Sequence, residues 1–138
     1  MTAKEYLLQA RFLDTRINAK IKQLEALNDL ATSATATLTG MPRDPNKAKS
    51  KLADTVVKIV DLQHEINDDI DRLVDLKREI RTVIESIADP EQQTILEKRY
   101  LCFQSWEQIS VDMGYAARHM FRLHDYALTK IKIPERCQ

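Results

Sequence analysis

The chain has 138 residues, of which 43% are hydrophobic and 30% charged, and its 21 basic and 21 acidic side chains give a formal net charge of zero. Only two glycines and four prolines occur, a composition typical of long helices rather than of a sheet protein. The charge balance argues against a protein that holds nucleic acid by bulk positive charge, because such affinity comes from cations that neutralise phosphates. The start MTAKEYLLQA lacks an apolar core, so we expect no signal peptide, no membrane span and a cytoplasmic location.

A first helix is predicted from about Ala3 to Thr37. Thr2 and Glu5 have the spacing of a capping box, which places the helix start just after Thr2. Lys20, with Ile21 beside it, interrupts an apolar stripe of three- and four-residue steps. The stripe consists of Tyr6, Ala10, Leu13, Ile17, Leu24, Leu27, Ala31, Ala34 and Leu38. A turn-forming, basic loop is predicted over about 39–50, where Gly40, Pro42 and Pro45 stop the helix.

A second helix is predicted from about Lys51 to Ala88, and at 1.5 Å per residue it is about 57 Å long. Its apolar stripe, with Gln63 and Lys77 as polar interruptions, consists of Leu52, Val56, Ile59, Ile66, Ile70, Leu73, Ile80, Ile84 and Ile87. The acidic run of Asp68, Asp69, Asp71 and Asp75 is assigned to the solvent side. Because no globular core of this size encloses such a helix, residues 1–88 are predicted to form an antiparallel coiled-coil hairpin.

The apolar face of the second predicted helix is wider than a seam between two helices requires. The additional residues are Val57, Val60, Leu62, Val74, Leu76 and Val83. This width favours a homodimer through the hairpin, although the same residues can instead be partly exposed or cover the carboxy-terminal part of a monomer.

Residues 89–138 are predicted to form a three-helix helix-turn-helix module, which makes the fold all-α. Asp89 is suited to cap a helix with Pro90 at its first position that extends to Tyr100. Ser105 and Gln108 form a second capping box before a helix that ends at Gly114, and a last helix follows from about Ala116 to Lys130. The predicted core of the helix-turn-helix consists of Trp106, Ile109, Met113, Gly114, Tyr115, Met120 and Leu123. An ordinary three-helix cluster that binds nothing has the same pattern.

The exposed start of the last helix is the candidate surface for double-stranded DNA. Arg118 and Arg122 lie four residues apart on one face, and arginine can donate two hydrogen bonds to guanine. Ala116 and Ala117 can meet thymine methyl groups, whereas Phe121 either does so or packs against the hairpin. His119 and Lys130 are candidates for phosphate contacts, as is the helix start at Trp106.

The segment from Glu91 to Lys132 resembles the carboxy-terminal helix-turn-helix of bacterial primary sigma factors, the region-four module that reads the promoter's upstream element. The matching frame consists of Ile95, Leu96, Arg99, Tyr100, Glu107, Gln108, Ile109, Gly114, Tyr115, Met120, Leu123, Ala127, Leu128, Thr129, Lys130 and Ile131. With the long helical region before it, the chain is similar to small proteins encoded by phages and prophages of Gram-positive bacteria, related in plan to late-transcription regulators of the RinA and ArpU type. Ala116, Ala117 and Arg118 replace the cap and the Arg-Glu pair of sigma modules, so the sigma base contacts do not carry over.

This resemblance implies a phage or prophage transcription regulator that binds promoter DNA. Two alternatives stay open, which are a sigma-like factor that binds RNA polymerase and a structural coiled-coil protein without DNA binding. The sequence contains no nucleophile elbow, phosphate loop or catalytic carboxylate pair, so we expect no enzyme and no cofactor. His119 and His124 are five residues apart and Cys102 and Cys137 lack ligand spacing, so no metal site is expected, and Cys102 is expected to be buried.

Overall fold

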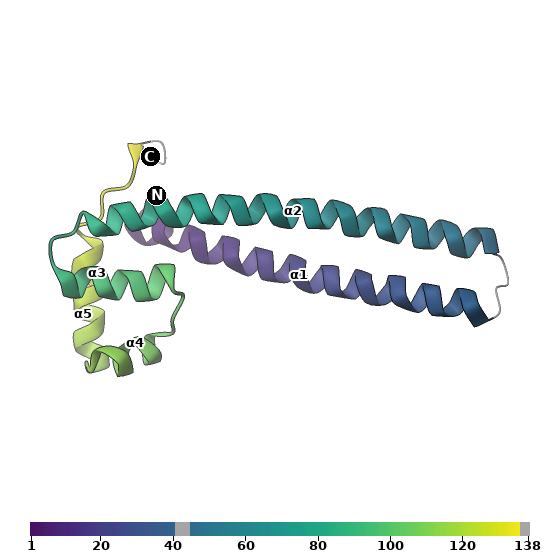
Figure 1. Cartoon of the computed structure of the whole chain (residues 1–138). Coiled ribbons are helices and arrows are strands. Elements are labelled where there is room, and N and C mark those ends of the chain that lie inside the picture. Colours follow the sequence, from purple (N-terminus) through teal and green to yellow (C-terminus); the bar gives the residue numbers. More distant parts are fainter. Residues whose placement is uncertain (41–44, 136–138) are drawn as a thin grey trace. The chain divides into compact units, whose positions relative to one another are not determined.

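The described secondary structure of this protein is entirely helical. The computed structural model describes the backbone of residues 1–40 and 45–135, and the side chains of residues 1–33 and 49–135. The elements in chain order are α1 (Ala3–Gly40), α2 (Pro45–Glu85), α3 (Pro90–Leu96), η1 (Glu97–Leu101), α4 (Trp106–Met113) and α5 (Ala117–Leu128) (Figure 1). The predicted all-α fold with a long amino-terminal helix pair is confirmed.

The ends of the two long helices follow from local hydrogen bonds. The Thr2 hydroxyl accepts from the Glu5 N–H at 3.2 Å and the Glu5 carboxylate accepts from the Thr2 N–H at 2.9 Å, so the predicted capping box forms. The predicted loop over about 39–50 was too long, because α1 continues to Gly40 and α2 begins at Pro45. Proline suits the first position of a helix, where its missing N–H costs nothing. Residues 41–44 of that prediction lie outside the described part.

The chain forms two compact units. The hairpin unit comprises Thr15–Arg72, and the helix-turn-helix unit comprises Met1–Asp14 together with Leu73–Gln138. The start of α1 and the end of α2 therefore belong to the same unit as α3, η1, α4 and α5.

In the hairpin unit, α1 and α2 run side by side and meet along one seam (Figure 1). The residues of α2 in this unit that are buried or half-buried recur at three- and four-residue steps: Leu52, Thr55, Ile59, Leu62, Ile66 and Asp69. Val56, Gln63 and Ile70, which the predicted stripe placed in the seam, are exposed. The seam is thus rotated from the prediction, and Asp69, assigned to solvent, lies in it.

Lys20 explains this rotation. Its ammonium lies 2.5 Å from the Asp69 carboxylate, whose side chain is only 8% exposed, and 3.7 Å from Glu65. A charge at a helix seam is tolerated where an opposite charge meets it. The hydrogen bond from Lys20 lowers the pKa of Asp69, although burial acts in the opposite direction. The lysine that interrupts the stripe of α1 therefore selects the face of α2 that carries an aspartate.

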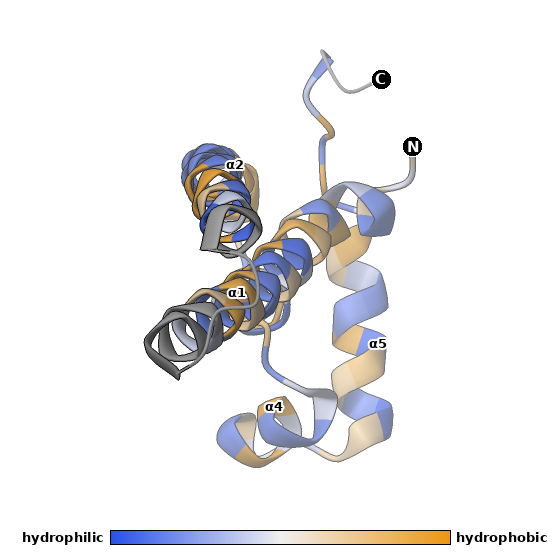
Figure 2. Ribbon diagram, turned by 90° about the vertical axis from the view of Figure 1, so that its right-hand side faces the viewer, coloured by the Kyte–Doolittle hydropathy of each residue, from blue (hydrophilic) through white to orange (hydrophobic). Residues whose placement is uncertain are grey.

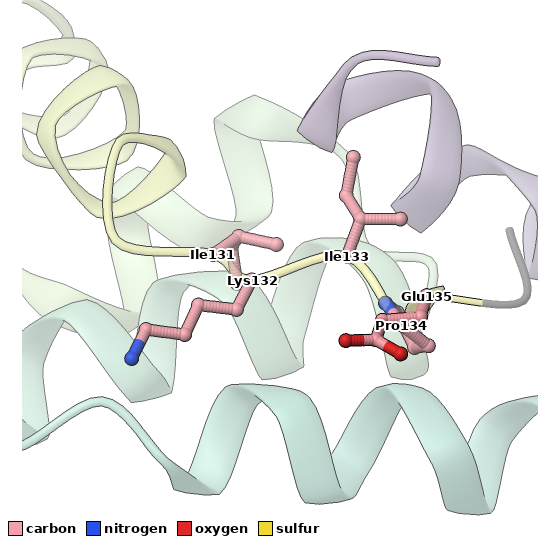
Figure 3. Close-up of a pocket in the computed structure, with 5 residues that line it drawn as sticks. All are labelled: Ile131, Lys132, Ile133, Pro134 and Glu135. Carbon is pink, nitrogen blue, oxygen red and sulfur yellow. The ribbon is translucent and has the colours of Figure 1, made fainter. Parts of the chain in front are cut away.

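The core of the helix-turn-helix unit combines residues from several helices. Its buried members are Tyr6, Leu7, Ala10, Ile80, Ile84, Ile87, Leu96, Tyr100 and Ala127. Ile131 and Ile133, in the segment after α5, pack against this cluster. Figure 3 shows Ile133 directed toward the start of α1, beside the shallow hollow that residues Ile131 to Glu135 line. This segment holds the end of α5 against the long helices.

The helix that begins at Pro90 changes from an α-helix to a π-helix after Leu96. Asp89 caps it as predicted, accepting from the Glu91 N–H at 2.9 Å. From Glu97 to Leu101 the chain continues as the π-helix η1, which closes with a bond from the Cys102 N–H to the Glu97 carbonyl. Such a turn adds a residue and changes the direction of the side chains around it. The side chain of Tyr100 becomes buried here.

Candidate nucleic-acid interface

Ser105 begins α4, and Ser110 and Gly114 shape the turn between α4 and α5. Ser105 caps α4 by accepting from the Gln108 N–H at 3.2 Å, but the Gln108 side chain donates to Asp112, so only half of the predicted capping box forms. Gly114 ends α4 with φ 68°, a conformation that favours glycine. The Ser110 hydroxyl donates to the Tyr115 carbonyl and the Ser110 carbonyl accepts from the Tyr115 N–H. These bonds set the angle at which α5 leaves the turn.

The residues predicted for the helix-turn-helix core lie together. Ile109 and Met120 are buried with Ile95 of α3, and the half-buried residues that pack against them are Trp106, Met113, Tyr115 and Leu123. Gly114 is exposed at the turn itself. A hydrogen bond with Glu91 raises the pKa of Tyr115 and links the turn to α3. The helices α3 and α4 therefore hold one face of α5 and leave the other exposed.

An aromatic cluster fixes α5 against α4 and η1. The Trp106 ring meets Phe121 edge to face at 5.1 Å and His124 at 4.6 Å between ring centres. The Arg99 guanidinium lies 4.5 Å from the centre of the Trp106 ring and donates to the Gln104 carbonyl. Phe121 thus packs against α4 on one edge, while 42% of its surface remains exposed.

Tyr100 and His124 form a buried hydrogen bond of 2.6 Å between the hydroxyl and Nε2. The Asp125 carboxylate lies 3.5 Å from Nδ1 of His124, which favours a proton on Nδ1 and leaves Nε2 to accept from Tyr100. Burial lowers the pKa of His124 against the opposing effect of Asp125, and burial raises the pKa of Tyr100 to about 12. Both groups are therefore neutral near pH 7. Sequence reasoning missed this pair, because an isolated histidine gives no sign of its partner.

The exposed face of α5 carries most of the predicted DNA-binding residues. Ala117, Arg118, His119 and Arg122 are exposed on its first turns. The His119 ring rests edge-on against Tyr115 at 4.7 Å, so its position is fixed by the turn. Figure 2 shows hydrophobic and hydrophilic residues alternating along α5, as expected for a helix with one packed and one open face.

Lys130 lies apart from this group, beyond the cap residue Thr129 that ends α5. Its ammonium lies 4.7 Å from the centre of the Tyr126 ring. Tyr126 is 58% exposed and was not singled out from the sequence. Tyr126 lies four residues from both Arg122 and Lys130, and this spacing could have identified it from the sequence as a neighbour of both.

The start of α5 has no side-chain cap. Ala116 has an extended conformation, and its side chain offers no acceptor to the first N–H groups of the helix. A helix start of this kind can donate to a phosphate.

The described residues hold neither a cluster of metal ligands nor a membrane-spanning helix. Among them, no three His, Cys, Asp or Glu side chains gather as a metal site would require. None of the described helices is long and apolar enough to cross a membrane. Cys102, expected to be buried, is exposed because it follows η1 at the start of the loop to α4. Cys137 lies outside the described residues.

The fold and the open face of α5 define a small helical protein with a carboxy-terminal helix-turn-helix module. Residues 45–132, which span α2 to α5, match the model of a family described as "Protein of unknown function (DUF1492)". The match covers more than half of the chain, which therefore belongs to this family. No curated protein and no solved structure matches the chain.

Proposed function

We propose that this protein is a sequence-specific DNA-binding transcription regulator of phage or prophage origin, related in plan to the RinA and ArpU types. The observation that carries the proposal is the arrangement of α5. One face packs on α3 and α4 through Met120 and Leu123, while the opposite face presents Arg118 and Arg122. A helix that packs on its own protein with one face and exposes basic side chains on the other is suited to bind in the major groove of DNA.

The proposed contacts follow from the chemistry of each side chain. Arg118 and Arg122 donate to guanine O6 and N7, and Ala117 leaves room for a thymine methyl group. His119 and the uncapped start of α5 contact phosphates, which fixes the position of the helix along the groove. Because the net charge of the chain is zero, affinity depends on these few contacts rather than on a broad positive surface.

The test is a titration of the purified protein against fragments of its own genomic neighbourhood at two salt concentrations. We expect saturable, fragment-selective binding that an Arg118→Ala/Arg122→Ala variant reduces by at least 10-fold and makes less selective, because these two side chains contact bases. The matched control is Arg78→Ala/Arg81→Ala, which removes two exposed arginines from α2 and changes the net charge equally. If no fragment is preferred and both variants behave like the wild type, the proposal fails and a structural coiled-coil role replaces it.

A second candidate function is direct contact with RNA polymerase. Val111 on α4 is 76% exposed, and the exposed Glu107 lies four residues before it on the same side of the helix. An apolar side chain beside an acidic one suits a protein surface better than DNA, whose phosphates repel a carboxylate. Val111→Ser should weaken binding to purified RNA polymerase and leave the DNA titration unchanged. Arg118→Ala/Arg122→Ala should do the reverse.

We propose further that the protein is a homodimer through its hairpin. In the hairpin unit, α2 exposes the branched aliphatic side chains of Val56, Val57, Val60 and Ile70 outside the seam with α1. A second copy that covers these residues would remove them from water. Sedimentation should show a dimer for the wild type and a monomer for Val60→Glu, with Val111→Glu as a control that remains dimeric.

A further inference from the structure

We propose that Tyr126 and Lys130 form a phosphate clamp at the end of α5, in addition to the contacts at its start. This inference rests on the proposed function, since it assumes that α5 lies in the major groove. It assigns a role to a tyrosine that is exposed among charged residues without contributing to either core cluster.

Arg118, Arg122 and Tyr126 follow one another at four-residue steps along α5, and their side chains leave the helix in different directions. Each step of four residues rotates a side chain by about 40° and advances it by about 6 Å. With Arg118 directed at the base edges, Arg122 lies about 40° and Tyr126 about 80° around the helix. A major groove is about as wide as a helix with its side chains, so a group near 80° meets the groove wall. That wall is the sugar-phosphate backbone.

The two sides of α5 differ in what covers them. Phe121, about 60° around the helix on the other side of Arg118, is held by Trp106 of α4. Tyr126 has no such cover, and 58% of its surface is exposed. The flank with Tyr126 is therefore the one that DNA can approach without a collision with α4.

Lys130 gives this flank its positive charge. The Lys130 ammonium lies 4.7 Å from the centre of the Tyr126 ring, so this ammonium and the Tyr126 hydroxyl lie near each other. A phosphate oxygen can accept from both, and charge-assisted hydrogen bonds of this kind are strong. The carboxylate of Asp125, the neighbouring exposed residue, lies 3.5 Å from Nδ1 of His124, on the side of α5 away from Tyr126.

The clamp predicts an effect that does not depend on DNA sequence. We would measure binding to a fluorescently labelled, mixed-sequence duplex of about two helical turns by anisotropy at two salt concentrations. Tyr126→Phe removes only the hydroxyl, and we expect affinity to fall about 10-fold with no change in salt dependence. Lys130→Ala should also weaken binding and reduce the salt dependence by about one ion. Phe12→Ala, which removes an exposed aromatic ring from α1, should leave binding unchanged.

The outcomes separate this inference from the function on which it rests. If the wild type binds the duplex and Tyr126→Phe binds equally well, the clamp is wrong and the role of Arg118 and Arg122 is unaffected. If the wild type binds only the fragments of its genomic neighbourhood, the same variants are compared on the preferred fragment, with the same expected effects. If it binds neither this duplex nor any fragment, the proposed function fails together with the clamp. Circular dichroism of Tyr126→Phe should match that of the wild type, because Tyr126 is an exposed residue.

Discussion

The two compact units bury different kinds of side chain. In the helix-turn-helix unit, aliphatic and aromatic residues from several helices pack together. The polar side chains of Tyr100 and His124 are buried there and form a hydrogen bond with each other. In the described part of the hairpin unit, Ile17, Ile66 and Asp69 are the buried residues. Many side chains fix every helix in the first unit, whereas one ion pair decides which face of α2 meets α1 in the second. We therefore expect substitutions to change stability mainly through lost packing in the helix-turn-helix unit and mainly through lost charge in the hairpin unit.

The largest expected effect comes from Ile109→Ala, which would leave a cavity between α3, α4 and α5. We expect a loss of about 2–5 kcal/mol in the free energy of unfolding. Val111→Ala, two residues further along the same helix, should change it by less than about 0.5 kcal/mol because Val111 is exposed. Urea unfolding followed by the fluorescence of Trp106, the single tryptophan, measures both. Equal losses for the two variants would contradict the packing described for this unit.

Tyr100→Phe should have the next largest effect. It removes the donor to Nε2 of His124 and leaves a buried acceptor without a partner, which costs about 1–3 kcal/mol. Tyr126→Phe deletes the same atom from an exposed residue and serves as the matched control. Both variants can be compared in the same urea titrations. A Tyr100→Phe protein as stable as the control would mean that the buried hydrogen bond contributes nothing.

Local and periodic patterns predicted much of this structure because they depend on near neighbours. The capping pairs at Thr2 and Asp89 require only a few adjacent residues, and the positions of Ile109 and Met120 follow from helical spacing beside a glycine turn. The all-α fold and the paired long helices followed from the same patterns.

The features that the sequence did not predict depend on contacts between distant residues. Two neighbouring stripes of α2 have heptad spacing, one with Val56 and Ile70 and one with Asp69, and only Lys20 on the other helix distinguishes them. The hydrogen bond between Tyr100 and His124 joins residues 24 positions apart through a π-helix that spacing does not reveal. Tyr126 was overlooked because an exposed aromatic residue becomes informative only beside Arg122 and Lys130.

Mild acid should destabilise the helix-turn-helix unit through His124. Its pKa is lowered by burial from the ordinary value of 6.5, so below that value the unfolded chain takes up a proton before the folded one does. The free energy of unfolding should therefore fall as the pH decreases from about 6.5 toward the lowered pKa. Urea midpoints from Trp106 fluorescence at several pH values measure this. His124→Gln should lose this part of the pH dependence, whereas His119→Gln, at an exposed position, should retain it.

The smallest expected effect concerns Asp69, and it occurs at a lower pH. Because Lys20 lowers its pKa from the ordinary 3.8, the stabilisation is complete above that value and is lost as the pH falls through the lowered pKa. At pH 7, Asp69→Asn should lower the midpoint of helix unfolding seen by far-UV circular dichroism, and Asp68→Asn, at the exposed neighbour, should not. The difference between Asp69→Asn and wild type should disappear in strong acid, where both side chains are neutral. If it persists there, packing rather than charge selects the face of α2, and the contrast between the two units does not hold.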